Sequence, residues 1–166
     1  MVDPGGRPFV AGVVPVQPEL VVRTAALWAG AAGASSLYCA YADPGRVTEE
    51  EFADGTVRHA AIDPDADYGW QEVARDLESA LHTLLDDAGV PWSFRFLAGR
   101  PDRALTHLAR AVDASVFVVG GRRPGAAHRM REFVEGSVAV HLAQHQHRPV
   151  LVVPVRVVDW KERPWG

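Results

Sequence analysis

The chain has 166 residues, enough for one domain with a core that needs no disulfide or structural metal. Its apolar content of 48% and charged content of 23% are ordinary for a globular protein, and its net charge of −4 argues against a general nucleic-acid binder. The single cysteine, Cys39, stands in an apolar run, so a buried and inert thiol is expected.

The chain begins with MVDPGGR, where a secretory signal would be basic and then apolar. No apolar run approaches the roughly 20 residues that a membrane-spanning helix needs. We therefore expect a cytoplasmic protein that contacts neither membrane nor nucleic acid.

Strands and helices alternate in the first part of the chain. Continuous apolar runs at residues 9–14 and 37–42 predict two strands buried on both faces. Between them, a helix is predicted that begins at Pro18 and Glu19 and ends at Gly33. Its inward face is predicted to contain Val21, Ala25, Trp28 and Ala32.

Residues 46–62 interrupt this alternation. Two polar, strand-like segments flank the turn Ala53-Asp54-Gly55, which predicts a β-hairpin. Because the segment is polar, we expect it to be an insertion that lies away from the main sheet.

The alternation then resumes. A helix ending near Gly89 is predicted from the stripe Trp70, Val73, Leu77, Leu81, Leu84 and Ala88. Alternating residues at 92–96 predict an edge strand, and Pro101 begins a helix with Leu105, Leu108 and Val112 inward. A strand at residues 116–119, a helix that ends before Pro149 and a strand at residues 150–153 follow.

This order predicts an α/β domain: a parallel sheet with helices on both faces and right-handed crossovers. In such sheets ligands bind beyond the carboxyl ends of the strands, where the strand order reverses. The strands beginning at Phe9 and Val116 are expected to flank that point. The loop GGRRPGAAHRMREFVEGS, residues 120–137, leaves the second of them, and strand, glycine loop and helix form the layout of a phosphate-binding site.

Nearly the whole chain resembles the universal stress protein family. The strongest match is VVGG…EGSVAVHLAQHQHRPVLVVP, within residues 118–154, with GRPDRALTHLARAVDASVFVVGG before it. The resemblance implies a five-stranded doubly wound sheet of order 3-2-1-4-5, with residues 8–155 as the domain and the hairpin as an insertion. It also implies ATP binding, with the phosphates in a loop G-x2-G-x9-G-[ST] and an aspartate at the end of the first strand.

The chain meets that pattern in part. Gly120 and the pair Gly136-Ser137 match, but the spacing between them is three residues longer, and Arg123 replaces the second glycine unless Gly125 takes its role. Val14 stands at the aspartate position. Tyr41 falls where the second strand offers backbone atoms to adenine. The resemblance thus assigns the nucleotide to Val14, Tyr41, Gly120, Gly121, Arg122, Arg123, Gly125, Gly136, Ser137 and Val138.

Two effects oppose each other at this degenerate site. Losing a carboxylate at Val14 costs roughly 1.5–3 kcal/mol of binding, whereas arginine side chains recognise phosphate bidentately. In the alternative interpretation, the arginines only solvate the loop and pair with Glu132 and Glu135, and Gly136-Ser137 only caps the last helix.

Metal binding and catalysis have little support in the sequence. His141 and His145 share a helix face and His147 follows, but no Asp, Glu or Cys stands near them to complete a site. We expect no metal beyond Mg²⁺ accompanying a nucleotide. Ser137 lacks the glycine-framed turn of a nucleophile, so no catalytic residue is predicted, although weak ATPase activity stays open.

The strand at residues 150–155 is expected at a sheet edge, yet it is apolar on both faces, which favours a homodimer formed through this strand. Residues 1–7 are expected to be flexible, and the tail, residues 156–166, to fold over the partner. The sequence leaves three alternative functions: a stress-response regulatory module with a degenerate ATP site, a dimeric interaction module that has lost nucleotide binding, and a nucleotide hydrolase.

Overall fold

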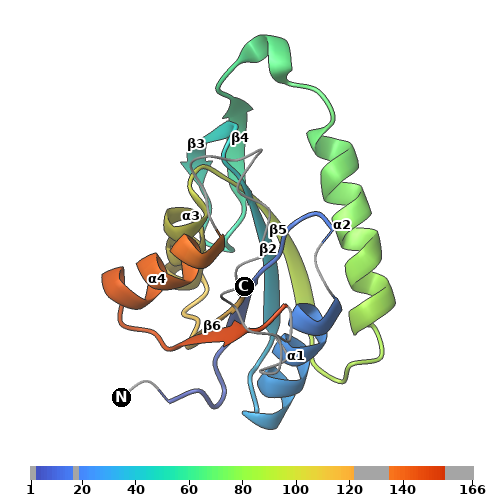
Figure 1. The fold of residues 1–166 in the computed structure, drawn as a ribbon, viewed down its shortest axis with the longest axis vertical. Coiled ribbons are helices and arrows are strands. Elements are labelled where there is room, and N and C mark those ends of the chain that lie inside the picture. Colours follow the sequence, from blue (N-terminus) through green and yellow to red (C-terminus); the bar gives the residue numbers. More distant parts are fainter. Residues whose placement is uncertain (1–2, 17–18, 122–134, 156–166) are drawn as a thin grey trace, which may run out of the picture.

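The structure is a computed structural model that describes residues 3–16, 19–121 and 135–155, without the side chains of residues 135–137. Five parallel strands form the main sheet in the order β5-β2-β1-β6-β7 (Figure 1). Their bounds are β1 Phe9–Gly12, β2 Leu37–Asp43, β5 Trp92–Ala98, β6 Val116–Gly120 and β7 Val150–Val153. With the hairpin set aside, this is the predicted order 3-2-1-4-5, so the fold prediction is confirmed.

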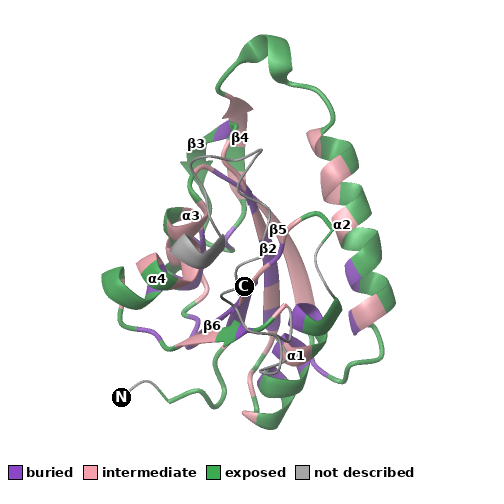
Figure 2. Ribbon diagram, viewed as in Figure 1, coloured by how far each residue is buried: buried purple, intermediate pink, exposed green. Residues whose placement is uncertain are grey.

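Helices cover both faces of the sheet. The helices are α1 Glu19–Ala31, α2 Trp70–Leu85, α3 Pro101–Ala111 and α4 Glu135–His145, with a short 3-10 helix, η1, at Pro64–Ala66. Alternate strand residues separate the core in two: Phe9 and Ala11 pack with α1 and α2, whereas Val10 packs with α3 and α4. Figure 2 shows the buried residues concentrated in the central strands.

Two helices differ in detail from their predictions. Trp28 was predicted to face inward, but 54% of it is exposed. The buried face of α1 is instead formed largely by small residues that allow the helix to approach the sheet: Val21, Val22, Ala25, Ala26 and Ala29. Ala88, also predicted inward, is exposed. Helix α2 ends at Leu85, whereas the apolar stripe in the sequence continues for three more residues, to Ala88.

The predicted hairpin is confirmed, as β3 Arg46–Glu51 and β4 Val57–Ala61 pair antiparallel. It does not lie apart from the domain. Gly55 adopts φ 82° at the turn, and a Cβ atom there would collide with Leu108 of α3. Arg95 of β5 donates through Nη2 to the Asp54 carbonyl at 3.0 Å. The hairpin is therefore packed against β5 and α3.

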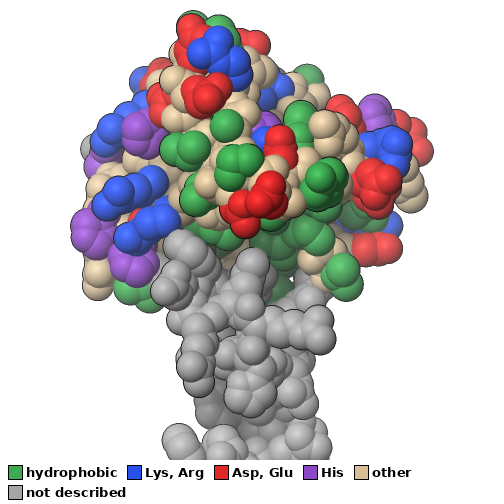
Figure 3. All heavy atoms as spheres, turned by 90° about the horizontal axis from the view of Figure 1, so that it is seen from above, with side chains coloured by type: hydrophobic (Ala, Val, Ile, Leu, Met, Phe, Trp, Pro, Cys, Tyr) green, Lys and Arg blue, Asp and Glu red, His purple; other side chains and the backbone are tan. Residues whose placement is uncertain are grey.

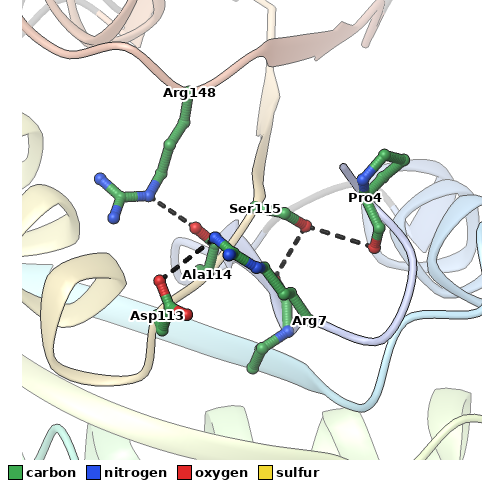
Figure 4. A network of polar contacts seen from close by, with 7 residues as sticks. Pro4, Arg7, Asp113, Ala114, Ser115 and Arg148 are labelled. Carbon is green, nitrogen blue, oxygen red and sulfur yellow. Dashed lines mark hydrogen bonds and ion pairs between the residues drawn. The ribbon is translucent and has the colours of Figure 1, made fainter. Parts of the chain in front are cut away.

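The amino end of the sheet is closed by polar contacts (Figure 4). Arg148 is buried, and its Nε donates to the Ala114 carbonyl at 2.6 Å; burial lowers the pKa of this guanidinium. Ser115 Oγ donates toward the Pro4 and Pro8 carbonyls, at 3.5 and 3.4 Å. These contacts stabilise the end of the sheet opposite the expected ligand site. Among the described residues, no helix is long and apolar enough to cross a membrane.

Candidate nucleotide site

The strand order reverses between β1 and β6, which are neighbours in the sheet. From β1 the chain continues through α1 to β2 on one side, and from β6 it continues through α4 to β7 on the other. In open α/β sheets, ligands bind beyond the carboxyl ends of two strands whose connections diverge in this way. Figure 3 views this end of the molecule, where hydrophobic side chains and some acidic ones share the middle of the described surface, with further charged side chains around them.

The end of β1 is tightly packed. A Cβ atom at Gly12 would lie 3.2 Å from Leu105 and 3.3 Å from Val119. Val13 is buried and donates its backbone N–H to the Ala40 carbonyl at 2.8 Å, so the ladder with β2 continues past the strand. Val14 follows and is half-buried. Its side chain is able to make apolar contacts at the switch point, but it carries no carboxylate.

The end of β2 carries Tyr41, one residue beyond the pairing of Gly12 with Ala40. The Tyr41 ring packs against the core cluster on the α1 and α2 side and meets Phe96 edge-on, with 5.5 Å between ring centroids. Burial, and then the nearby Asp43 carboxylate, raise the pKa of the Tyr41 hydroxyl. The hydroxyl is therefore uncharged at neutral pH and is able to donate a hydrogen bond.

The end of β6 supplies the first glycines of the predicted loop. Gly120 pairs with Val153 of β7, and Gly121 donates its N–H to the Val153 carbonyl at 2.7 Å. A Cβ atom at Gly121 would lie 3.4 Å from that carbonyl oxygen, an ordinary van der Waals distance. Arg122, Arg123 and Gly125 lie outside the described residues.

The first turn of α4 contains Gly136 and Ser137, directly after Glu135. Backbone N–H groups in a first helical turn have no partner within the helix, and they attract anions. Val138 is half-buried and packs against the core cluster that contains Leu142. The described part of the site thus consists of the ends of β1, β2 and β6 and the start of α4.

A polar and aromatic group that the sequence did not indicate borders Tyr41. We call it the Arg46 cluster: Arg46, His59, Asp67, Trp70 and Phe96. Arg46 is 5% exposed; its Nε donates to His59 Nδ1 at 2.7 Å, and its Nη1 binds Asp67. Its guanidinium carbon lies 5.2 Å from the centroid of the Trp70 ring.

The chemistry of Arg46 determines the state of His59. A guanidinium only donates hydrogen bonds, so His59 Nδ1 must be unprotonated to accept one. Burial, and then the positive charge of Arg46, lower the pKa of His59. The centroids of the His59 and Phe96 rings lie 5.2 Å apart, and the Phe96 ring in turn packs against the Tyr41 ring. The cluster therefore joins the hairpin and α2 to the end of β2.

A small cavity lies elsewhere, between the hairpin and α3. Its volume is about 30 Å³, and its lining includes Thr48, Gly55, Leu97 and His107. This is room for about one water molecule, whereas ligand pockets measure roughly 300–1,000 Å³. The described residues also contain no group of three His, Cys, Asp or Glu side chains suited to a metal ion.

We compared the sequence with models of known protein families. The model of the universal stress protein family matches residues 21–154. The chain belongs to the universal stress protein family. No curated protein gives a significant match to its sequence.

Solved structures of other family members share the fold. A universal stress protein from Archaeoglobus fulgidus superposes with a TM-score of 0.62 and 21% identity, covering 88% of this chain and 97% of that one. The structure of the universal stress protein from the same organism in complex with dAMP gives 0.59 and 21%, covering 88% and 96%. A universal stress protein in complex with cAMP gives 0.56 and 23%, covering 92% and 99%.

Proposed function

We propose that this universal stress protein is a cytoplasmic regulatory module that binds an adenine nucleotide at the switch point between the carboxyl ends of β1 and β6. The observation that carries the proposal is the convergence of the β1, β2 and β6 ends with the first turn of α4 at the switch point. Two structures that share the fold contain dAMP and cAMP. A nucleotide here would place its base near Tyr41 and its phosphates near the Gly120 and Ser137 backbones.

The proposed site is degenerate, and phosphate contacts dominate it. The side chain of Val14 offers no hydrogen-bond acceptor to the nucleoside, so we expect binding to depend on Arg122, Arg123 and the amides of α4. Mg²⁺ would accompany a triphosphate and neutralise part of its charge. The described residues of the site include no nucleophile with an assigned base, so we propose binding without turnover.

The experiment is a thermal-shift titration with ATP, AMP and inorganic phosphate. We expect each to raise the unfolding temperature, and Arg122→Ala/Arg123→Ala to abolish the shift with phosphate and to reduce it with ATP. Arg110→Ala is the matched control, because Arg110 is exposed near the end of α3. If millimolar ATP leaves the wild-type unfolding temperature unchanged, the nucleotide proposal is wrong.

A second candidate is a dimeric interaction module that has lost the nucleotide. The apolar Val14 and the tight packing around Gly12 favour it. Both candidates include a homodimer formed through β7, an edge strand with Val152 46% exposed. Pro154 lacks a backbone donor, so the ladder between the two β7 strands would be interrupted near that residue.

A further inference from the structure

Helix α1 is apolar on two opposite sides. Its inner side packs on the sheet, as described above. The side that faces away from the sheet, which we call the outer face of α1, carries Leu20, Thr24, Leu27 and Ala31, and Trp28 borders it, about one turn from the buried Ala25. Leu20 is 53% exposed, Leu27 is 70% exposed and Trp28 is 54% exposed. Leu20, Thr24, Leu27 and Ala31 are spaced by four, three and four residues, so they form one stripe along the helix, with Trp28 beside it.

Such a helix is unusual at a protein surface. An amphipathic surface helix turns charged residues outward, and a helix that is apolar all round is normally covered on all sides. Glu19 and Arg23 border the stripe and pair with each other at 3.3 Å, so they place no unpaired charge on the outer face. A contiguous apolar stripe of this kind marks a contact site.

The end of the described chain lies beside this helix. Strand β7 packs against α1, and Val155 contacts the same core cluster as the inner face of α1. Because β7 is parallel to β1, the described chain ends at the edge of the sheet where α1 begins.

The length and composition of these residues match the outer face. Residues 156–166, RVVDWKERPWG, number 11, and at roughly 3.3 Å per residue they reach about 36 Å when extended. Helix α1 has 13 residues, and at 1.5 Å per residue it is about 20 Å long. The segment carries Val157, Val158, Trp160 and Trp165, whose apolar area suits a stripe of Leu and Trp.

We propose that the C-terminal segment, residues 156–166, packs along the outer face of α1 of the same chain, in place of the contact with a partner chain that the sequence led us to expect. Its two tryptophans cover Leu20, Leu27 and Trp28, while its charged residues stay in water. The inference does not depend on nucleotide binding, because it concerns the outer side of a helix whose inner side is core.

A spin label in the segment tests this placement by NMR. Glu162→Cys provides one reactive thiol, since Cys39 is buried and its pKa is raised to about 12. A nitroxide at position 162 should selectively weaken the amide signals of α1 and leave those of α3, on the other face of the sheet, unchanged. Leu20→Gln/Leu27→Gln should restore the α1 signals, whereas Val140→Gln, at an exposed valine of α4, should not.

A second sample separates one chain from two. Isotope-labelled protein without the nitroxide is mixed with unlabelled protein that carries it, and no weakening of α1 is expected. Weakening of α1 in this mixed sample alone would overturn the proposal in favour of a second copy as the occupant. If the nitroxide weakens the amide signals of α1 no more than those of α3 in either sample, the proposal is wrong.

Discussion

At the end of β1, the side chain of Val14 limits what the site is able to bind. A carboxylate at this position would accept hydrogen bonds from a nucleoside, and each such bond is worth roughly 1.5–3 kcal/mol, or about ten- to a hundred-fold in affinity. We therefore expect Val14→Asp to tighten ATP binding by this factor in a calorimetric titration. Val14→Asn, which lacks the charge, is the control and should gain less. A variant that unfolds at lower temperature and binds no better would show that Val14 is core.

His59 gives the molecule a predicted pH dependence. Its pKa is lower in the folded chain than in the unfolded one, first because burial disfavours the charged imidazole and then because protonation would place a second positive charge beside Arg46 and remove its acceptor. The unfolded state thus binds more protons, so this contribution to stability is present above the unfolded pKa, about 6.5, and is lost as pH falls through the folded value. The nearby carboxylates of Asp43, Asp67 and Glu49 moderate the effect.

Chemical unfolding between pH 5 and 8 measures this contribution. His59→Gln retains an acceptor and should flatten the loss of stability at low pH. His147→Gln, at an exposed position after α4, is the control and should leave the wild-type profile unchanged. If the His59 variant keeps the wild-type profile, His59 does not carry the dependence.

At the scale of elements, Arg46 should hold the hairpin and α2 together. Arg46→Met removes charge-assisted hydrogen bonds to His59 and Asp67 at a buried position, which should cost about 2 kcal/mol. Arg58→Met is the matched control on the same hairpin: Arg58 pairs with Glu49 and Glu50 at an exposed site, which is worth at most about 1 kcal/mol. Hydrogen exchange should accelerate across β3 and β4 in the first variant alone. Equal acceleration in both would contradict the role of Arg46.

The elements also show what sequence patterns are able to predict. Apolar runs and helical stripes predict strands, helices and their order, because burial follows from periodicity. The Arg46 cluster is different: its members come from a hairpin, a loop, a helix and a strand, and no local pattern links them. Trp28 was misplaced for a related reason: Val21 and Ala25 of the predicted face are buried, but spacing alone did not show that the buried face would continue through Ala29 and leave Trp28 at its border.

The candidate site was predictable in outline. Strand order and the glycines at residues 120, 121 and 136 indicated the switch point, and the structure places the described ones at the ends of β6 and the start of α4. The packing of Tyr41 against Phe96, and of Gly12 against α3, depends on contacts between distant segments. Such contacts form only in the tertiary structure, so they leave no periodic pattern in the amino-acid sequence.

At the scale of the whole molecule, the apolar edge strand β7 predicts a twofold dimer. A charge placed on it enters the interface twice, so Val152→Arg should convert the dimer to a monomer or cause aggregation. Val140→Arg on α4 is the control: Val140 is similarly exposed, at 52% against 46%, and should leave the dimer intact. Light scattering at micromolar concentration measures both. A monomeric wild type would contradict the dimer.

The proposed function depends on the binding of an adenine nucleotide at the switch point between β1 and β6. Isothermal titration of nucleotide-free protein with ATP and Mg²⁺ tests it most directly. We predict saturable binding at one site per chain, and a loss of at least about tenfold in affinity, or roughly 1.4 kcal/mol, for Arg122→Ala/Arg123→Ala. Folded protein that shows no saturable heat at millimolar ATP would contradict the claim.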